Sequence, residues 1–430
     1  MTTELLLTPV GAGKTASVLN FLLEALNQQP ALAFPRVWVL LPNNRQETMF
    51  RQRLIEHPAA HRVVFNVEFF DFYQLYERLL DMAGKPQRQL DHTARYRLLR
   101  SLLGRLQNQL QVYGQIAQTP GFVDNVASFI YELKQNLVEP DAFANAATTP
   151  KDHDLATIYR AYQNTLQDYH LVDREGEGWL ALGELEDNPA IAADVHLLLV
   201  DGFDQFNPLQ ARLLARLSAH VGRALVTLPT IPGREETVGR RFRRARQQLE
   251  IAHEEYEVPL TIHEDLTGYT FDRHPALNNW LERSFLAGVQ PHPSAGCLAL
   301  IETPDPANEV NAVLRQVKRR LLVDGCQPDD IILAVRDWAR YGGYLAQGAR
   351  TYGLPIALHY GEALAHNPAI IALMNLLELA KFDFRRRRLI DVLRSPYFAV
   401  PARTPARPGA GLPPMPALKT APRAGSTKCV

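Results

Sequence analysis

The residue types best suited to chemistry lie near the start of the chain, where an apolar run leads into a turn ending in Gly-Lys-Thr at residues 13–15. The turn fits the phosphate-binding pattern G-x-x-x-x-G-K-[ST], except that Thr8 stands at the position of the first glycine. An amphipathic run follows it, so the order is strand, loop, helix. A surface turn that happens to contain Gly-Lys-Thr is the alternative, but the flanking strand and helix are the context that the motif requires.

Each residue of this loop has a role that its type can fill. The small residues Gly11, Ala12 and Gly13 allow backbone N–H groups to curl around an anion, and the following helix points its N-terminus at the same anion. Lys14 can reach the outer phosphates of a nucleotide, and Thr15 can offer a hydroxyl to Mg²⁺. The loop therefore predicts a site for ATP and Mg²⁺.

A second acidic position is needed to hold the metal, and Asp201 is the best candidate. It follows residues 196–200, a nearly continuous apolar run that is typical of a strand buried on both faces of a parallel sheet. Parallel sheets bind ligands at the carboxyl ends of their strands, where Asp201 is expected. The alternative is an ordinary buried strand that ends in a turn. The phosphate-binding loop at residues 8–15 favours a metal-binding role for Asp201 instead. In that role Asp201 holds Mg²⁺ through a water molecule.

The segment 200–210, V-D-G-F-D-Q-F-N-P-L-Q, resembles the superfamily 1 helicase motif V-D-E-F-Q-D-T-S-P-L-Q. The Asp, the Phe and the Pro-Leu-Gln end that includes Gln210 all match. The glutamate after the Asp, which in helicases activates the attacking water, is Gly202 here. The Asp-Gly-Phe variant is similar to the B subunit of AddAB-type helicase–nucleases, whose helicase half is degenerate.

This resemblance implies an α/β P-loop NTPase fold of the superfamily 1 helicase type. Residues 1–84 and 190–290 form the first RecA-like domain, residues 85–189 an inserted helical subdomain, and residues 296–400 part of a second RecA-like domain. The insertion explains why Asp201 lies so far beyond Lys14, since one βαβ unit spans only about 30 residues.

The resemblance also suggests further nucleotide and DNA contacts. Arg336 ends an expected strand that resembles a helicase motif whose arginine approaches the nucleotide. The other interpretation of Arg336 is an arginine that forms a salt bridge at the end of its strand. The loop 43–46 is similar to a helicase loop that contacts single-stranded DNA. It can equally be an ordinary connection between a strand and a helix. The aromatic stretch 69–76 can stack on bases but at helical spacing is more often core. Residues 239–246 carry five arginines that suit phosphates or a solvated helix face.

Composition sets the general class. The chain has 430 residues, 46% of them hydrophobic, and equal numbers of Lys+Arg and Asp+Glu, 46 each. This is a globular composition of two to three domains without a strongly basic surface. Cys297, Cys326 and Cys429 are too scattered for a disulfide framework or a zinc site. With no leader or apolar span visible, we expect a cytoplasmic protein without a membrane partner.

The end of the chain breaks the pattern, because residues 401–430 are rich in Pro, Ala and Gly and carry no acid. We expect this tail to be disordered. AddB-type proteins continue with a nuclease domain and an iron–sulfur cluster, and neither a nuclease signature nor a four-cysteine set is visible here. We therefore expect a shortened N-terminal portion without the cluster.

The function that this sequence favours is the ATP- and DNA-binding, helicase-like part of an AddB-type subunit. Such a subunit acts with an A-type helicase–nuclease partner in double-strand break repair. A self-standing ATP-driven DNA motor and a non-hydrolysing nucleotide-binding scaffold are the alternatives. Gly202 argues against the motor, since loss of a general base costs about 10²–10⁴ in rate.

Overall fold

The computed structural model describes residues 3–9, 13–27, 35–58, 65–231, 236–264, 296–358 and 364–398. The chain divides into two compact units, residues 1–298 and 299–430. Gly11, Ala12 and the expected tail from residue 401 lie outside the described residues, as does the segment 277–286, where the sequence predicts a short helix. Within the described part, no helix is long and apolar enough to cross a membrane.

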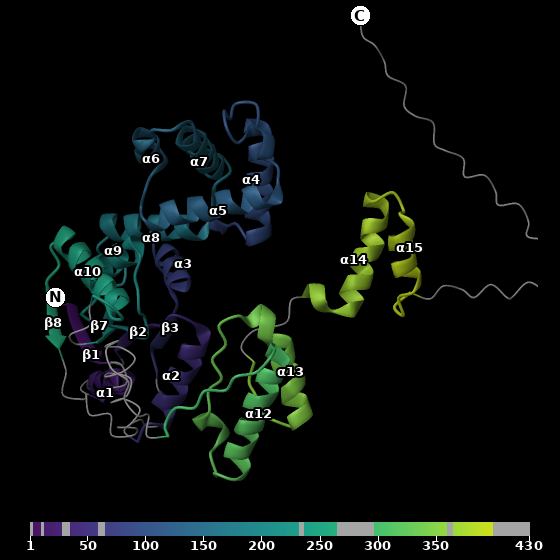
Figure 1. Cartoon of the computed structure of the whole chain (residues 1–430). Helices are drawn as coiled ribbons and strands as arrows, with labels where there is room; N and C mark the ends of the chain where they lie inside the picture. Colours follow the sequence, from purple (N-terminus) through teal and green to yellow (C-terminus); the bar gives the residue numbers. More distant parts are fainter. Residues whose placement is uncertain are drawn as a thin grey trace, which may run out of the picture. The chain divides into compact units, whose positions relative to one another are not determined.

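Unit 1 is built on a six-stranded parallel sheet with the strand order β3-β2-β6-β7-β1-β8 (Figure 1). The strands are β1 (Thr3–Pro9), β2 (Arg36–Leu40), β3 (Val67–Phe70), β6 (Val195–Val200), β7 (Arg223–Thr230) and β8 (Leu260–Glu264). The first RecA-like domain was expected to have a parallel sheet, and the α/β class is confirmed. β7 lies between β1 and β6, so these three strands end at one edge of the sheet.

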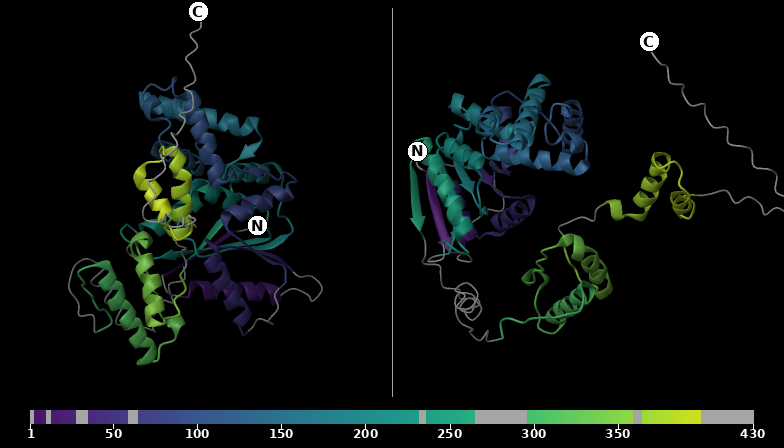
Figure 2. Two further views of the ribbon diagram at one scale, coloured as in Figure 1. Left: turned by 90° about the vertical axis from the view of Figure 1, so that its right-hand side faces the viewer. Right: turned by 45° about the horizontal axis from the view of Figure 1, so that its top comes forward.

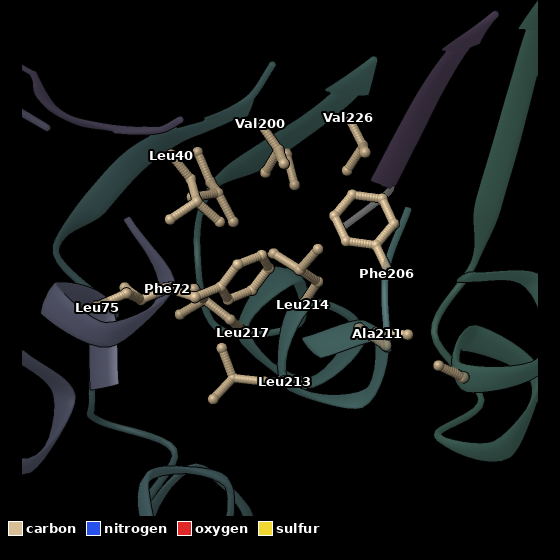
Figure 3. Packing of buried hydrophobic residues seen from close by; sticks show 14 of the residues in the cluster. Leu40, Phe72, Leu75, Val200, Phe206, Ala211, Leu213, Leu214, Leu217 and Val226 are labelled. Atoms are coloured by element: carbon tan, nitrogen blue, oxygen red, sulfur yellow. The ribbon is translucent and has the colours of Figure 1, made fainter. Parts of the chain in front are cut away.

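Apolar side chains cover both faces of this sheet, because neighbouring residues of a strand point to opposite sides. On one face Leu40, Val200 and Val226 pack with Phe72 and Leu214 from the helices above (Figure 3). On the other face the core contains residues such as Val37, Val39 and Leu199. The continuous apolar runs that predicted buried strands at 36–41 and 196–200 are therefore explained by burial on both sides.

Helices form a layer on each face. The face with Val39 and Leu199 is covered by α1 and α2, and the other face by α3, α8, α9 and α10 (Figure 2). Their bounds are α1 (Lys14–Asn27), α2 (Asn44–Glu56), α3 (Phe72–Met82), α8 (Arg174–Asp187), α9 (Pro208–Ser218) and α10 (Arg240–Glu255). The aromatic stretch 69–76 contributes Phe72 and Tyr76 to the core, which confirms the core interpretation over exposed stacking groups.

The segment between β3 and β6 is mostly helical and has a second apolar core made by α4, α5 and α7. The elements before α8 are β4 (Arg88–Gln89), α4 (His92–Leu106), α5 (Pro120–Gln135), α6 (Pro140–Ala146), α7 (Pro150–Asp168) and β5 (Leu171–Val172), with a 3₁₀ turn at Gly114–Ile116. β4 and β5 pair over two residues, a short parallel contact that the helical pattern did not indicate. Like α3, α8 joins the core of the sheet, whereas α4, α5 and α7 form the separate second core.

A buried ion pair joins three of these helices. Lys134 Nζ of α5 lies 2.6 Å from Asp173 Oδ1, and Tyr162 Oη of α7 donates to Asp173 Oδ2 at 3.0 Å. Asp173 also caps α8 by accepting from Gly176 N at 2.8 Å. Because each partner is buried and hydrogen-bonded, the pair fixes how α5, α7 and α8 meet.

Glu175, in the first turn of α8, is almost fully buried next to this pair. Burial raises the pKa of its carboxyl group to about 7, and the nearby charge of Asp173 adds to the shift. Tyr73 Oη donates to Glu175 Oε1 at 3.4 Å, a long and weak contact. The carboxylate form is therefore poorly compensated in the folded protein.

Unit 2 contains α12 (Pro306–Leu322), α13 (Trp338–Tyr352), α14 (Pro368–Lys381) and α15 (Arg386–Leu393), with 3₁₀ turns at Pro328–Asp330 and Leu364–His366. α12 and α13 pack through Val310, Leu314 and Leu345. The sequence pattern predicts helices over 309–322 and 367–379 and a helix start within the basic run 385–388, and all three are confirmed.

The apolar patterns of residues 297–302 and 331–336 predict two strands, and both predictions are wrong. Neither segment adopts a regular strand conformation. A strand requires a hydrogen-bonded neighbour, and the described residues of unit 2 contribute no strand to either sheet. The apolar patterns alone could not supply that partner. The assignment of 296–400 to a second RecA-like domain stays a prediction.

The raised pKa of Glu175 predicts a pH-dependent stability. Its folded pKa lies above the usual value of 4.5, so unfolding releases protons between about pH 4.5 and 7 and stability falls as pH rises through that window. Glu175→Gln should therefore stabilise unit 1 at pH 8, by on the order of 2–3 kcal/mol, and change little at pH 5. Urea unfolding at both pH values measures this.

The matched control is Glu254→Gln, an exposed glutamate on α10. It should leave stability nearly unchanged at both pH values. Equal effects of Glu175→Gln at pH 5 and pH 8 would contradict the assignment.

Candidate functional site

The polar site that unites the predicted residues of unit 1 centres on Asp201, immediately after β6. Lys14 Nζ lies 3.2 Å from Asp201 Oδ1, and Thr15 Oγ1 donates to Asp201 Oδ2 at 3.1 Å. The carboxylate is 2% exposed. Thus the structure brings together three of the predicted site residues, Lys14, Thr15 and Asp201, although Thr15 and Asp201 are 186 positions apart in sequence.

The sheet positions these groups by its strand order. Val200 lies opposite Val226 of β7, and Leu5 of β1 lies opposite the same residue from the other side. Asp201 N also donates to Leu40 O at 3.1 Å, which extends the pairing of β6 with β2 beyond the end of the strand. The carboxylate is therefore held at the carboxyl edge, where parallel sheets bind ligands.

The loop before Lys14 is described only at its end. Gly13 has φ +84°, a conformation that glycine adopts without strain. Gly13 O accepts from Ala16 N at 2.8 Å and from Ser17 N at 3.1 Å, so α1 begins directly after it. Lys14 and Thr15 are consequently in the first turn of α1, beside its free N–H groups and the positive end of its dipole.

Thr227 is a residue of this site that sequence reasoning missed. It lies in the middle of β7, is buried, and its Oγ1 donates to Asp201 Oδ1 at 2.5 Å. The hydrogen bond from Thr227 holds Oδ1 of Asp201 in place, while Oδ2 of Asp201 accepts from Thr15. A threonine within an apolar strand looks like ordinary core, so no motif pointed to it.

The site could accept a hard divalent cation. Thr15 and Asp201 supply a hydroxyl and a carboxylate, the oxygen ligands that Mg²⁺ prefers, and Mg²⁺ is usually held by one or two carboxylates together with phosphates and water. Among the described residues, no cluster of three or more His, Cys, Asp or Glu side chains is placed to hold a metal ion. The donor set therefore fits a metal that arrives with a phosphate ligand.

The segment after Asp201 is fixed by aromatic packing. Phe203 and Phe206 both contact Phe72 of α3 edge-on, at centroid distances of 5.2 Å and 6.2 Å. Gln210 completes a capping box at the start of α9, because it accepts from Asn207 N at 3.2 Å while its own N–H donates to Asn207 Oδ1 at 2.8 Å. Gln210 thus has a clear structural role in this arrangement.

The remaining basic candidates are Arg336 and the arginines of α10. Arg336 belongs to unit 2, is exposed, and does not end a strand, so its approach to a nucleotide stays a prediction. In α10, Arg241 pairs with Asp204 at 2.9 Å and Arg243 with Glu236 at 3.0 Å. Asp204 and Glu236 thus already pair with two of the five arginines in residues 239–246. This favours the interpretation of these arginines as a solvated helix face over phosphate binding.

Comparison with known protein families shows to which family this chain belongs. The family model described as "ADDB, N-terminal" matches residues 5–280. This chain belongs to the ADDB N-terminal family. The matched range contains the phosphate-loop motif and Asp201, so the resemblance noted in residues 200–210 is confirmed at the level of the family.

Curated relatives of this AddB-type chain share one name, which describes the B subunit of an ATP-dependent helicase/deoxyribonuclease. The protein from Exiguobacterium sibiricum is 24% identical over 92% of this chain and 35% of its own length. Those from Desulforudis audaxviator and Bacillus subtilis are 26% and 22% identical over 88% and 90% of this chain, and each is covered over 34% of its length. The chain therefore spans about a third of the length of the curated relatives it matches.

The contact between Thr227 and Asp201 predicts a measurable stability effect. Thr227→Val keeps the shape of the side chain but removes the donor, so a buried carboxylate loses one of its partners. This should lower the free energy of unfolding by about 1–3 kcal/mol, which urea unfolding can measure.

Thr3→Val is the matched control, since Thr3 is equally buried in β1 and its Oγ1 has no hydrogen-bond partner in the described part of the chain. That substitution should be neutral or stabilising. Equal losses from both substitutions would show that the Thr227 hydroxyl is unimportant.

Proposed function

We propose that unit 1 binds ATP with Mg²⁺ at the carboxyl edge of its sheet, as the helicase-like portion of an AddB-type subunit. The observation that carries the proposal is the convergence of Lys14 and Thr15 on Asp201. An ammonium, a hydroxyl and a carboxylate at the N-terminus of a helix suit a metal–phosphate ligand.

Each group has a distinct task in this proposal. Lys14 neutralises the outer phosphates, and the free N–H groups at the start of α1 bind the inner ones. Thr15 would hold Mg²⁺ directly and Asp201 through water, where the ion neutralises phosphate charge. Lys14 and Thr15 would then exchange their contacts with Asp201 for contacts with the ligand.

The same site is poorly equipped for hydrolysis. The residue after Asp201 is Gly202, so the position next to the metal-binding carboxylate offers no second carboxylate to take a proton from water. We propose that the chain by itself binds ATP but hydrolyses it slowly or not at all, which favours a nucleotide-binding scaffold over a self-standing motor.

Partners follow from the relatives' names. Proteins named as the B subunit of a helicase/deoxyribonuclease have a second subunit and act on DNA. We propose that this chain likewise binds DNA and an A-type helicase–nuclease subunit, in the repair of double-strand breaks. In such a complex, ATP bound here would regulate or stabilise the assembly while the partner supplies most of the hydrolysis.

Two substitutions test the nucleotide site. Lys14→Ala should weaken Mg–ATP binding roughly ten- to a hundredfold, because a charge-assisted contact of about 1.5–3 kcal/mol is lost. Asp201→Asn should weaken binding only when Mg²⁺ is present, since without metal the carboxylate merely repels phosphate. Calorimetric titration with a non-hydrolysable ATP analogue, in Mg²⁺ and in EDTA, measures both.

Lys85→Ala provides the control, because Lys85 is exposed and pairs with Glu184 on α8. It should leave nucleotide affinity unchanged. Unchanged affinity in Lys14→Ala, or an equal loss for Asp201→Asn in EDTA, would refute the proposed site.

A further inference from the structure

Gly202 lies against the side chain of Gln46, the last residue of the expected loop 43–46. Its φ is +85°, and a β-carbon at this position would collide with Gln46 Oε1 and lie 3.2 Å from Pro42 Cδ. The end of the Gln46 side chain therefore occupies the space that a side chain at residue 202 would need. Gln46 and Gly202 fit each other as a pair.

Gln46 is held firmly enough at its backbone to have a defined position. Its N–H donates to Asn43 Oδ1 at 3.0 Å, the cap of α2. Phe50 and Leu54 anchor the same helix in the core beneath the sheet. The amide group consequently projects from the first turn of α2 towards the residue that follows Asp201.

The strand order separates Gln46 from the phosphate loop. Lys14 and Thr15 reach Asp201 from the β1 side, whereas Gln46 reaches Gly202 from the β2 side. Three strand spacings, about 14 Å, separate the ends of β1 and β2. A phosphate chain that starts at the N-terminus of α1 and runs towards Asp201 thus brings its last phosphate closest to Gln46.

We propose that the Gln46 amide contacts the terminal phosphate of the bound nucleotide, or the water beside it. This inference rests on the proposed nucleotide site and adds to it a residue that distinguishes ATP from ADP. An amide can donate and accept hydrogen bonds but takes up no proton at neutral pH. Gln46 therefore positions the terminal phosphate without supplying a general base.

Gly202 is the partner that makes this arrangement possible. Any side chain at 202 displaces the flexible end of Gln46, and a non-glycine residue at φ +85° is also strained. Gly202→Ala should therefore affect nucleotide preference in the same way as removal of the Gln46 amide itself.

The test compares the affinities of a Mg–ATP analogue and of Mg–ADP for the full chain and its variants. Gln46→Ala should weaken the ATP analogue roughly three- to tenfold, as expected for one lost hydrogen bond, while ADP affinity stays within about twofold. Gly202→Ala should give a similar selective loss, and the double variant should be no worse than Gly202→Ala alone. Thermal unfolding shows whether each variant is folded.

The matched control is Gln52→Ala, an exposed glutamine of the same helix whose amide donates to Glu56. It should leave both affinities unchanged. Equal losses for ATP and ADP in Gln46→Ala, or no loss for either, would overturn the role of Gln46 while leaving the nucleotide site intact. Failure of the wild-type chain to bind either nucleotide would instead overturn the proposed function.

Discussion

One buried carboxylate connects the elements that form the candidate site. Asp201 accepts from Thr227 within the sheet and contacts Lys14 and Thr15 at the start of α1. These contacts exist only because β7 lies between β1 and β6 in the observed register. A shift of one residue along a strand would turn Thr227 to the opposite face and leave Asp201 without its partner. The apolar core on both faces of the sheet therefore holds the site in place.

In the proposed site, binding and hydrolysis would depend on different groups. Phosphate binding would depend on α1 and Asp201, whereas water activation would need a base beyond Asp201. At that point the backbone takes a conformation suited to glycine, and Gln46 fills the adjacent space. Introducing a carboxylate at residue 202 would therefore require a change at Gln46 as well. The proposed role, binding of a nucleotide with little hydrolysis, is consistent with this arrangement.

Much of unit 1 could be predicted from sequence because its signals are local. Apolar runs predicted the strand that contains Thr8 and the strand that precedes Asp201, and the Gly-Lys-Thr turn predicted the positions of Lys14 and Thr15. The contacts of Thr227 and Gln46 could not be found in this way, since each residue meets a partner that is distant in sequence. Thr227 belongs to no motif, and the loop that contains Gln46 pointed only to DNA. The strands expected at 297–302 and 331–336 failed for a related reason: apolar periodicity indicates a strand but cannot provide the neighbour with which it must pair.

The most direct test of this account is an experimental structure of the chain with Mg²⁺ and a non-hydrolysable ATP analogue. The account predicts phosphates at the N-terminus of α1 and Lys14 Nζ moved from Asp201 to a phosphate oxygen. It also predicts Mg²⁺ on Thr15, with Asp201 one water away. A structure in which the nucleotide binds elsewhere, while Lys14 keeps its contact with Asp201, would contradict it.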